Sequence, residues 1–263
     1  QSMATVTAFG VQGAANVTAG FLNSVASGTA DSVDLVIDSG SSATFQVSGT
    51  TDTNEFETIN LTSSGSAKNT VVIKDAGGNN PAGLKTYNVS GAAALTQTLA
   101  GGASKATFDA SSATGKQTLT WGGNYTTLKT GSGDDTIDVK GGTFFGSTDK
   151  KVVDGGAGND TLIINEDVSN LTSNVATAPH AAPVGIETLQ VNAILANTGG
   201  GGADVARTIE ADVFTSEDTI RIKLENNDTN ADSSGGDDVA VTINDIGTET
   251  IKISSKASAT GTN

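Results

Sequence analysis

The chain has 263 residues, of which 36% are hydrophobic and only 4% aromatic, with 33 glycines and no cysteine. The 14 Lys and Arg against 29 Asp and Glu give a formal net charge of −15, which excludes a general nucleic-acid binder because such proteins need a basic face. The lack of cysteine excludes disulfides and zinc–thiolate sites. A core poor in aromatics must be thin, and the Thr, Ser, Gly and Val content favours strands over long helices, so we expect an all-β protein.

Residues 1–90 are expected to form a β-rich N-terminal segment. Val11 to Ala26 favours either a short helix or an edge strand. Period-two patterns separated by Ser, Gly and Asn predict further strands at residues 33–37, 44–47, 58–61 and 71–74. Residues 75–81 contain two glycines, two asparagines and a proline, which predicts a loop.

The beginning of the chain lacks the features of a cleaved export signal. Gln1 to Gly20 has neither a basic region nor a continuous apolar run, and no apolar run elsewhere approaches the length of a membrane span. Both ends are polar, which is typical of a segment of a larger protein. We therefore expect export without a cleaved N-terminal signal, and no membrane insertion.

Residues 35–40, Leu-Val-Ile-Asp-Ser-Gly, are similar to the active-site loop of aspartic peptidases, with Asp38 in the catalytic position. That chemistry requires two carboxylates that share a proton, so a second loop or a homodimer is obligatory. The closest second match, at residues 152–155, lacks the hydroxyl residue after Asp154. The only histidine, His180, lies in a Pro-flanked loop without a nucleophile elbow nearby. We expect no enzymatic activity, and an aspartic peptidase using Asp38 stays a remote alternative.

The densest motif lies in residues 91–165, which we expect to form a β-roll. Residues 155–163, Gly-Gly-Ala-Gly-Asn-Asp-Thr-Leu-Ile, fill every specified position of the nonapeptide Gly-Gly-x-Gly-x-Asp-x-aliphatic-x. Residues 130–138 give a second copy, in which Thr130 replaces the first glycine. A hairpin turn would explain one such copy, but two copies with the aliphatic residue in the same place favour a β-roll.

The glycines and aspartates of this repeat are suited to calcium. Glycine lets the backbone turn tightly with its carbonyls pointing inward, and the Asp adds an anionic oxygen. Two stacked turns can supply the roughly six to eight oxygens that Ca²⁺ prefers, whereas one turn cannot. The expected ligand residues are Gly131, Gly133, Asp134, Asp135, Asp154, Gly156, Gly158, Asn159 and Asp160, with side-chain oxygens from Asp135 and Asp160.

The apolar register extends upstream of these copies. Large apolar residues recur every nine to eleven positions at Leu99, Phe108, Leu119, Leu128 and Ile137, which predicts a solenoid. Most earlier turns lack the aspartate, so calcium is expected only from about Gly131 onward. The 25-residue offset between Thr130 and Gly155 predicts an insertion around residues 141–150 and leaves open whether the two turns face each other.

Residues 166–263 are expected to continue the solenoid as a β-rich C-terminal segment. Residues 166–185 predict a crossing loop, 197–204 a flexible loop or linker, and 226–238 either a further calcium loop or a solvated acidic loop. A second repeat, acidic-Thr-aliphatic-polar-aliphatic, recurs at residues 56–62, 186–192, 217–223 and 247–254, and each copy predicts a period-two strand.

Calcium nonapeptides and Glu-Thr strands in an acidic, cysteine-free chain rich in Thr, Ala and Gly resemble the surface-layer proteins of the RTX type. The resemblance implies a right-handed parallel β-solenoid with irregular Gly/Asp-rich loops and calcium as cofactor. It also implies one-step export and self-assembly into a two-dimensional lattice on the bacterial cell surface. A cell-surface polysaccharide is a candidate second partner, reached through regions outside this chain. The alternative is a segment of a calcium-dependent RTX adhesin that binds a surface ligand, with Trp121 and Tyr125 as candidate contacts.

Overall fold

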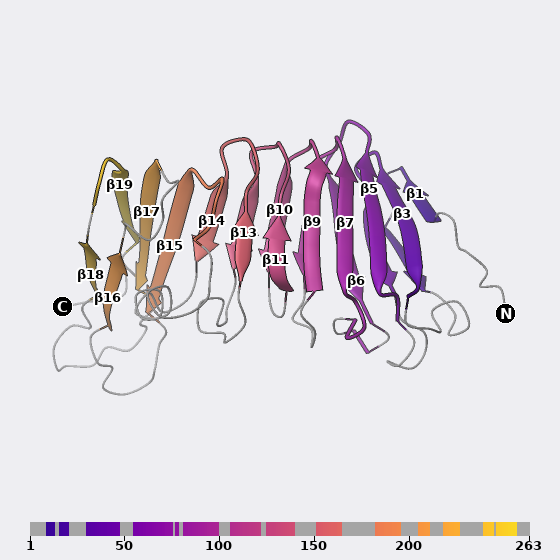
Figure 1. Ribbon diagram of the computed structural model, residues 1–263, viewed down its shortest axis with the longest axis horizontal. Coiled ribbons are helices and arrows are strands. Elements are labelled where there is room, and N and C mark those ends of the chain that lie inside the picture. Colours follow the sequence, from indigo (N-terminus) through magenta and orange to yellow (C-terminus); the bar gives the residue numbers. More distant parts are fainter. Residues whose placement is uncertain are drawn as a thin grey trace, which may run out of the picture.

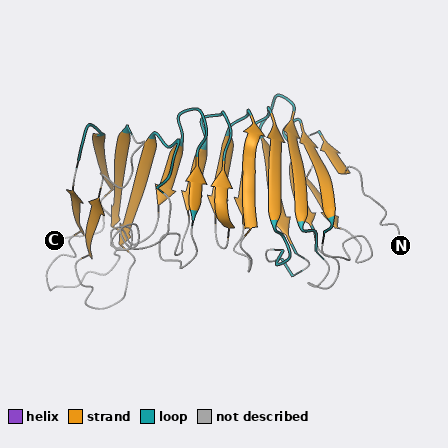
Figure 2. Ribbon diagram, viewed as in Figure 1, coloured by secondary structure: helices purple, strands orange, loops and turns teal. Residues whose placement is uncertain are grey.

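The computed structural model describes residues 9–13, 16–20, 30–47, 55–75, 77–78, 81–99, 106–121, 125–139, 151–164, 182–195, 205–210, 218–226, 239–244 and 246–256. These residues form a parallel β-solenoid, so the predicted fold class is confirmed (Figures 1 and 2). No helix occurs among them, and therefore none long and apolar enough to cross a membrane. Strand β1 lies at one end of the stack and β19 at the other (Figure 1).

Two sheets make up most of the solenoid, and every strand pairing in them is parallel. Sheet A has seven strands in the order β1 (Phe9–Gln12), β3 (Ser32–Asp38), β5 (Thr58–Ser64), β7 (Thr86–Gly91), β9 (Ala106–Ala113), β11 (Tyr125–Lys129) and β13 (Val152–Asp154). Because odd-numbered strands up to β13 lie in sheet A and even-numbered strands up to β14 in sheet B, the chain visits the two sheets alternately.

Sheet B has ten strands, which are β2 (Asn16–Gly20), β4 (Ser42–Gln46), β6 (Asn69–Lys74), β8 (Leu95–Leu99), β10 (Gln117–Trp121), β12 (Thr136–Val139), β14 (Thr161–Ile164), β15 (Thr188–Leu195), β17 (Thr219–Asn226) and β19 (Thr250–Lys256). Strands β16 (Val205–Glu210) and β18 (Val239–Asn244) pair with each other in a sheet of their own. After β13, an isolated parallel bridge between Asp154 and Val184 continues sheet A by one position.

A thin apolar core runs between the two sheets. In strands such as β3, buried residues alternate with outward-facing ones, and Val33, Leu35 and Ile37 are the buried set. The predicted register residues Leu99, Phe108, Leu119, Leu128 and Ile137 are all buried and lie on consecutive strands, β8 to β12. The spacing of nine to eleven residues is therefore half a coil, and the full repeat returns to the same sheet.

The aromatic side chains of this core pack in edge-to-face pairs, and Tyr87 of sheet A also reaches Gln97 of sheet B. Tyr87 meets Phe108 edge to face with ring centroids 5.4 Å apart, and its hydroxyl donates a 2.7 Å hydrogen bond to Gln97 Oε1. Phe9 and Phe45 make a similar contact at 5.9 Å. Such pairs contribute roughly 0.5–1.5 kcal/mol beyond the burial of their area.

The strand predictions for residues 33–37, 44–47, 58–61 and 71–74 are confirmed by β3, β4, β5 and β6. Between Val11 and Gly20 the described residues form the end of β1 and all of β2, as the strand alternative predicts, and residues 21–26 of that stretch lie outside the described residues. Sheet B passes through all three predicted segments, since β6 pairs with β8 and β14 pairs with β15. The predicted insertion at 141–150 and loops at 197–204 and 227–238 lie outside the described residues, as does most of the loop at 166–185.

Candidate functional site

The two nonapeptide turns lie directly on top of each other in consecutive coils. Strand β12 pairs with β14, so that Thr136 lies opposite Thr161. The turns themselves are joined by hydrogen bonds of 2.9 Å from Ala157 N to the Gly131 carbonyl and from Thr161 N to the Asp135 carbonyl. The 25-residue offset is therefore one full coil, and the two turns face each other.

The nonapeptide glycines allow this close stacking. A Cβ at Gly131 would lie 1.9 Å from the Ala113 carbonyl oxygen of the preceding coil. A Cβ at Gly156 would lie 2.1 Å from the Gly131 carbonyl oxygen, and Gly156 has a φ of 86°, which L side chains rarely adopt. The glycine pattern in the sequence thus corresponds to carbonyl oxygens placed over the α-carbons of the next coil.

Asp135 is buried and fully hydrogen-bonded. Its Oδ1 accepts a 2.6 Å bond from Gln117 N in the preceding coil, and its Oδ2 accepts a 3.1 Å bond from Gly131 N in its own turn. Burial raises the pKa of Asp135, and these hydrogen bonds oppose the rise. In this arrangement the carboxylate satisfies backbone donors on both sides of the turn.

Asp160 occupies the same place one coil later but is only half hydrogen-bonded. Its Oδ1 accepts a 2.7 Å bond from Asp135 N, whereas its Oδ2 is buried without a partner. Burial raises the pKa of Asp160 to about 7, and the nearby charges of Asp135, Glu187 and Asp134 act in the same direction. An unpaired buried carboxylate oxygen is costly, and either a proton or a cation would relieve it.

At the same register position, a column beside the start of the sheet B strands, other side chains also accept a backbone N–H of the preceding coil. Asn69 Oδ1 accepts a bond from Ser41 N at 3.1 Å, and Glu187 Oε2 accepts one from Asp160 N at 2.7 Å. In each case a side-chain oxygen of one coil satisfies a backbone N–H of the coil before it. Asp218 and Glu249 take the same register position, because the threonines that follow them pair with Thr188 and with each other.

Sequence reasoning missed that this column is a single repeat. It treated the nonapeptides and the Glu-Thr strands as separate patterns, although three of the four Glu-Thr copies lie in this column, and the copy at residues 56–62 lies in sheet A. The shared signal is an acidic residue followed by Thr, found at 135–136, 160–161, 187–188, 218–219 and 249–250. Aligned by sheet register, the acidic member accepts the N–H of the coil before it at Asp135, Asp160 and Glu187, and the Thr begins the strand.

Comparison of the chain with protein-family models, curated protein sequences and solved structures gives no match. What the turns can do therefore follows from their own residues. In the described part of the chain, no three His, Cys, Asp or Glu side chains form a group that could hold a metal ion. A cation bound between these turns would need backbone carbonyl oxygens as most of its ligands. Among the predicted ligand side chains, Asp160 Oδ2 is the buried oxygen that has no hydrogen-bond partner, so it can bind the cation as well.

The other predicted ligand side chains are spread around Asp160 and do not converge on a single metal position. Asp154 ends β13, and its Oδ1 accepts a 3.1 Å bond from Gly156 N. Asp134 and Asn159 are exposed, with Asn159 N donating to Asp134 Oδ1 at 3.0 Å. The charges of Asp134 and Asp135 thus act on Asp160. Asp154 instead accepts a hydrogen bond from the backbone at the start of the second turn.

The residues predicted for the two alternative functions, the peptidase and the adhesin, lie at the end of a strand and in the core. Asp38 ends β3, and its Oδ2 accepts a 3.2 Å bond from Gln12 of the preceding coil. Trp121 and Tyr125, the candidate ligand contacts of an adhesin, are both buried in the core. Lys151 lies over them, with its Nζ 5.1 Å from the Trp121 ring and 3.2 Å from the Tyr125 carbonyl. Neither aromatic ring therefore forms an exposed ligand platform.

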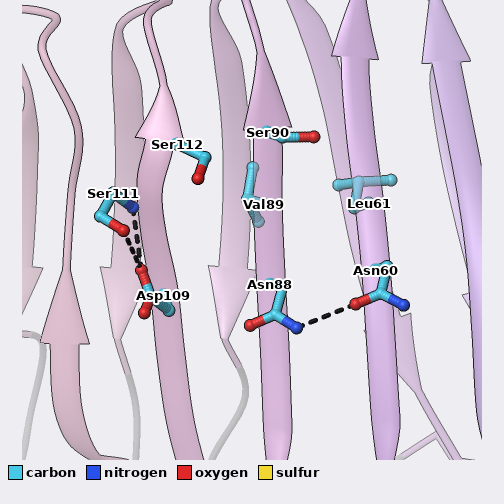
Figure 3. A pocket seen from close by; sticks show the side chains of 8 residues that line it. All are labelled: Asn60, Leu61, Asn88, Val89, Ser90, Asp109, Ser111 and Ser112. Atoms are coloured by element: carbon cyan, nitrogen blue, oxygen red, sulfur yellow. Dashed lines mark hydrogen bonds between the residues drawn. The ribbon is translucent and has the colours of Figure 1, made fainter.

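A shallow polar groove of about 230 Å³ lies on the outer face of sheet A (Figure 3). It forms where the register between β7 and β9 shifts, after Asn88. Its polar groups bind one another: Asn88 Nδ2 donates to Asn60 Oδ1 at 2.9 Å, and Asp109 accepts bonds from the Ser111 backbone and hydroxyl. These bonds from Ser111 lower the pKa of Asp109. The polar groups of the groove that form these bonds are therefore already paired with each other across neighbouring strands or within one strand.

Proposed function

We propose that this chain is a calcium-stabilised structural protein, secreted to the bacterial cell surface, where it self-assembles into a two-dimensional lattice. Its repeats resemble those of RTX-type surface-layer proteins, and a parallel solenoid is the fold that this resemblance implies. The observation that carries the calcium part is the buried, unpartnered Oδ2 of Asp160 within two stacked glycine turns. We propose no catalytic role.

Calcium would act on this site through linkage to folding. Closely spaced carboxylates at Asp134, Asp135, Asp160 and Glu187 raise the free energy of the folded state when no cation neutralises them. A cation that binds only the folded turns stabilises them by mass action. The chain would therefore fold better outside the cell, where calcium is plentiful, than in the calcium-poor cytoplasm.

One described end of the solenoid, at β19, supports a role in assembly. In the described part of the chain, β19 pairs on one side only, with β17. Ile253 lies in the same inward column as the buried Ile222, yet 66% of its surface is exposed. An unpaired strand edge beside exposed apolar core residues is the kind of surface that end-to-end packing of solenoids buries.

The test is a calcium titration of metal-free protein, followed by circular dichroism and light scattering. We expect calcium to increase the β signal and then to produce large ordered particles. Asp160→Asn should weaken the response, while Asp34→Asn, a matched change on the outer face of β3, should leave it intact. No response of the native chain at millimolar calcium would overturn the calcium part. A stronger β signal from a protein that stays monomeric would overturn the lattice and favour the adhesin.

A further inference from the structure

Asp31, immediately before β3, is joined to the following coil by three hydrogen bonds. Asp31 N donates to Glu57 Oε2 at 2.8 Å, and the Asp31 carbonyl accepts bonds from Glu57 N at 3.1 Å and Thr58 N at 3.0 Å. These bonds connect the start of β3 to the start of β5, which pair in parallel from Ser32 and Thr58 onward. They use the backbone of Asp31 and leave its carboxylate uninvolved.

The same three bonds join Asp160 to its following coil on sheet B. There Asp160 N donates to Glu187 Oε2 at 2.7 Å, and the Asp160 carbonyl accepts bonds from Glu187 N at 3.1 Å and Thr188 N at 2.9 Å. The residues before Asp31 do not match the nonapeptide, so no motif predicted a site there. The two aspartates lie five strand spacings, or roughly 24 Å, apart along the solenoid (Figure 1).

The Asp31 carboxylate is buried without a hydrogen-bond partner at either oxygen. Only 1% of the residue is exposed, and neither Oδ1 nor Oδ2 accepts a bond. Asp160 has one oxygen in this state, whereas Asp31 has two. Burial raises the pKa of Asp31, and the charge of Glu57 acts in the same direction. Because a buried carboxylate without donors is costly, a group that neutralises Asp31 stabilises the fold.

The two oxygens of Asp31 select a metal cation over a proton. A proton satisfies one oxygen at most and leaves the other buried without a donor, whereas a cation can bind both at once. Glu57 supplies a second carboxylate, and its Oε1 makes no hydrogen bond to a described residue. Among the described residues, no Lys or Arg pairs with either carboxylate. The next coil places Lys85 at this register position, which confines the acidic pair to Asp31 and Glu57.

We propose that Asp31 and Glu57 form a second calcium site, on sheet A, which stabilises the first coils of the solenoid. All the available ligand atoms are oxygens, which suit Ca²⁺ better than softer metals, and two carboxylates match its double charge. Backbone carbonyls and water complete the roughly six to eight oxygens that Ca²⁺ prefers. The inference rests on the proposed calcium role for the identity of the ion, and extends that role to coils where the sequence predicts no calcium.

The test is a calorimetric titration of Ca²⁺ into the metal-free whole chain and its variants. Asp31→Asn and Asp160→Asn should each bind one ion fewer than the native chain, because each loses a different site. Glu57→Gln keeps an oxygen that can accept Asp31 N but removes one charge, and should weaken binding at the Asp31 site about tenfold or more. Asp34→Asn, on the outer face of β3, is the matched control and should bind calcium as the native chain does.

Urea titrations with and without calcium separate a calcium ligand from a residue that only supports the fold. An ion that binds only the folded chain raises its urea midpoint. Calcium should therefore raise the midpoint of the native chain and of Asp34→Asn by equal amounts, and that of Asp31→Asn by less. Equal calcium-dependent shifts in all three proteins would mean that Asp31 is not a ligand, and would overturn the proposal.

The calorimetric outcomes distinguish this site from the calcium role proposed for the nonapeptide turns. Loss of an ion in Asp160→Asn but not in Asp31→Asn would overturn the second site alone. Loss of an ion only in Asp31→Asn would support the second site and remove Asp160 from the calcium ligands. No calcium binding by the native chain would overturn both. Unchanged binding in Asp31→Asn, with a carboxyl ¹³C shift of Asp31 that titrates in calcium buffer, would assign a proton to this position instead.

Discussion

Asp135 and Asp160 occupy equivalent positions in consecutive coils, but their second carboxylate oxygens have different environments. Each is 1% exposed, and each accepts a backbone N–H from the coil before it. Asp135 Oδ2 also accepts Gly131 N, whereas the equivalent donor in the later turn, Gly156 N, is bonded to Asp154. Asp160 Oδ2 is left without a partner.

Two residues that precede these aspartates differ between the turns. The Thr130 hydroxyl interacts with Asp135, whereas the later turn has Gly155 in its place. The other difference lies at the end of the preceding strand in sheet A. Asp154 pairs in register with Lys129 of the earlier coil. A carboxylate at this position accepts the first N–H of the turn, and an ammonium group cannot. Two nearly identical nonapeptides therefore differ in one carboxylate oxygen. Both oxygens of Asp135 are hydrogen-bonded, whereas Asp160 Oδ2 has no partner and is suited to hold a proton or a cation.

The largest effect is expected from the glycine that both turns use for stacking. Gly131→Ala places a Cβ 1.9 Å from the Ala113 carbonyl oxygen, so the coils must separate. We expect the free energy of unfolding to fall by at least about 4 kcal/mol, which is exceptionally large for a single substitution. Urea denaturation followed by circular dichroism measures it. Gly10→Ala, which meets nothing within 4 Å, is the control, and equal midpoints for the two variants would contradict the stacking.

A second prediction concerns pH. The folded pKa of Asp160, about 7, lies above its ordinary value of 3.8, so between these values the folded protein binds more protons than the unfolded chain. This contribution to stability is therefore present in full below the ordinary value and is lost as pH rises through about 7. We expect metal-free protein to lose roughly 3 kcal/mol of unfolding free energy from pH 4 to 8 through this group, below the full linkage value because the turn relaxes.

The measurement is a series of urea titrations in chelator from pH 4 to 8. Other buried carboxylates, such as Asp31, whose pKa is also raised by burial, contribute to the same slope. The prediction is therefore the difference between the native chain and Asp160→Asn, which should have a flatter profile. Parallel profiles for the two proteins would show that Asp160 does not titrate in this range.

The fold was largely predictable from the sequence because it depends on patterns within each strand. The alternation of Val33, Leu35 and Ile37 predicts a half-buried strand, and the regular return of large apolar residues predicts a coil. The nonapeptide glycines predicted tight turns, and Gly131 and Gly156 indeed lie where a side chain would meet the backbone of the neighbouring coil.

The environment of the carboxylates was not predictable in the same way because it depends on register between coils of unequal length. Thr118 pairs with Thr136, 18 residues later, whereas Thr188 pairs with Thr219, 31 residues later. No fixed period aligns such coils. The pairing of Lys129 with Asp154, on which the hydrogen bonds of Asp160 depend in part, therefore becomes visible only in the structure.

Replacement of each aspartate by asparagine should have effects of opposite sign at pH 8 without metal. Asp135→Asn turns one of two accepting oxygens into a donor that faces a backbone N–H, and should cost about 1–3 kcal/mol. Asp160→Asn removes an unpaired buried charge and should stabilise by roughly 1 kcal/mol. The two urea midpoints must move in opposite directions. A shift of the same sign in both variants would mean that the turns do not differ as described.

The smallest effect on stability, and the most specific, is expected at the residue that distinguishes the two turns. Asp154→Lys gives the strand end the residue of the earlier coil and frees Gly156 N to donate to Asp160 Oδ2. It should change the free energy of unfolding by less than about 1 kcal/mol, because the bond that is lost is exposed. A carboxylate that gains a backbone donor has a lower pKa, so the pKa of Asp160 should fall below about 7. Carboxyl ¹³C shifts recorded against pH report this directly. The reciprocal change, Lys129→Asp, should take Gly131 N from Asp135 and raise the pKa of Asp135. Movement of the two pKa values in these opposite directions would show that the side chain at the strand end controls the first N–H of each turn, and no movement would leave the difference to Thr130 and Gly155.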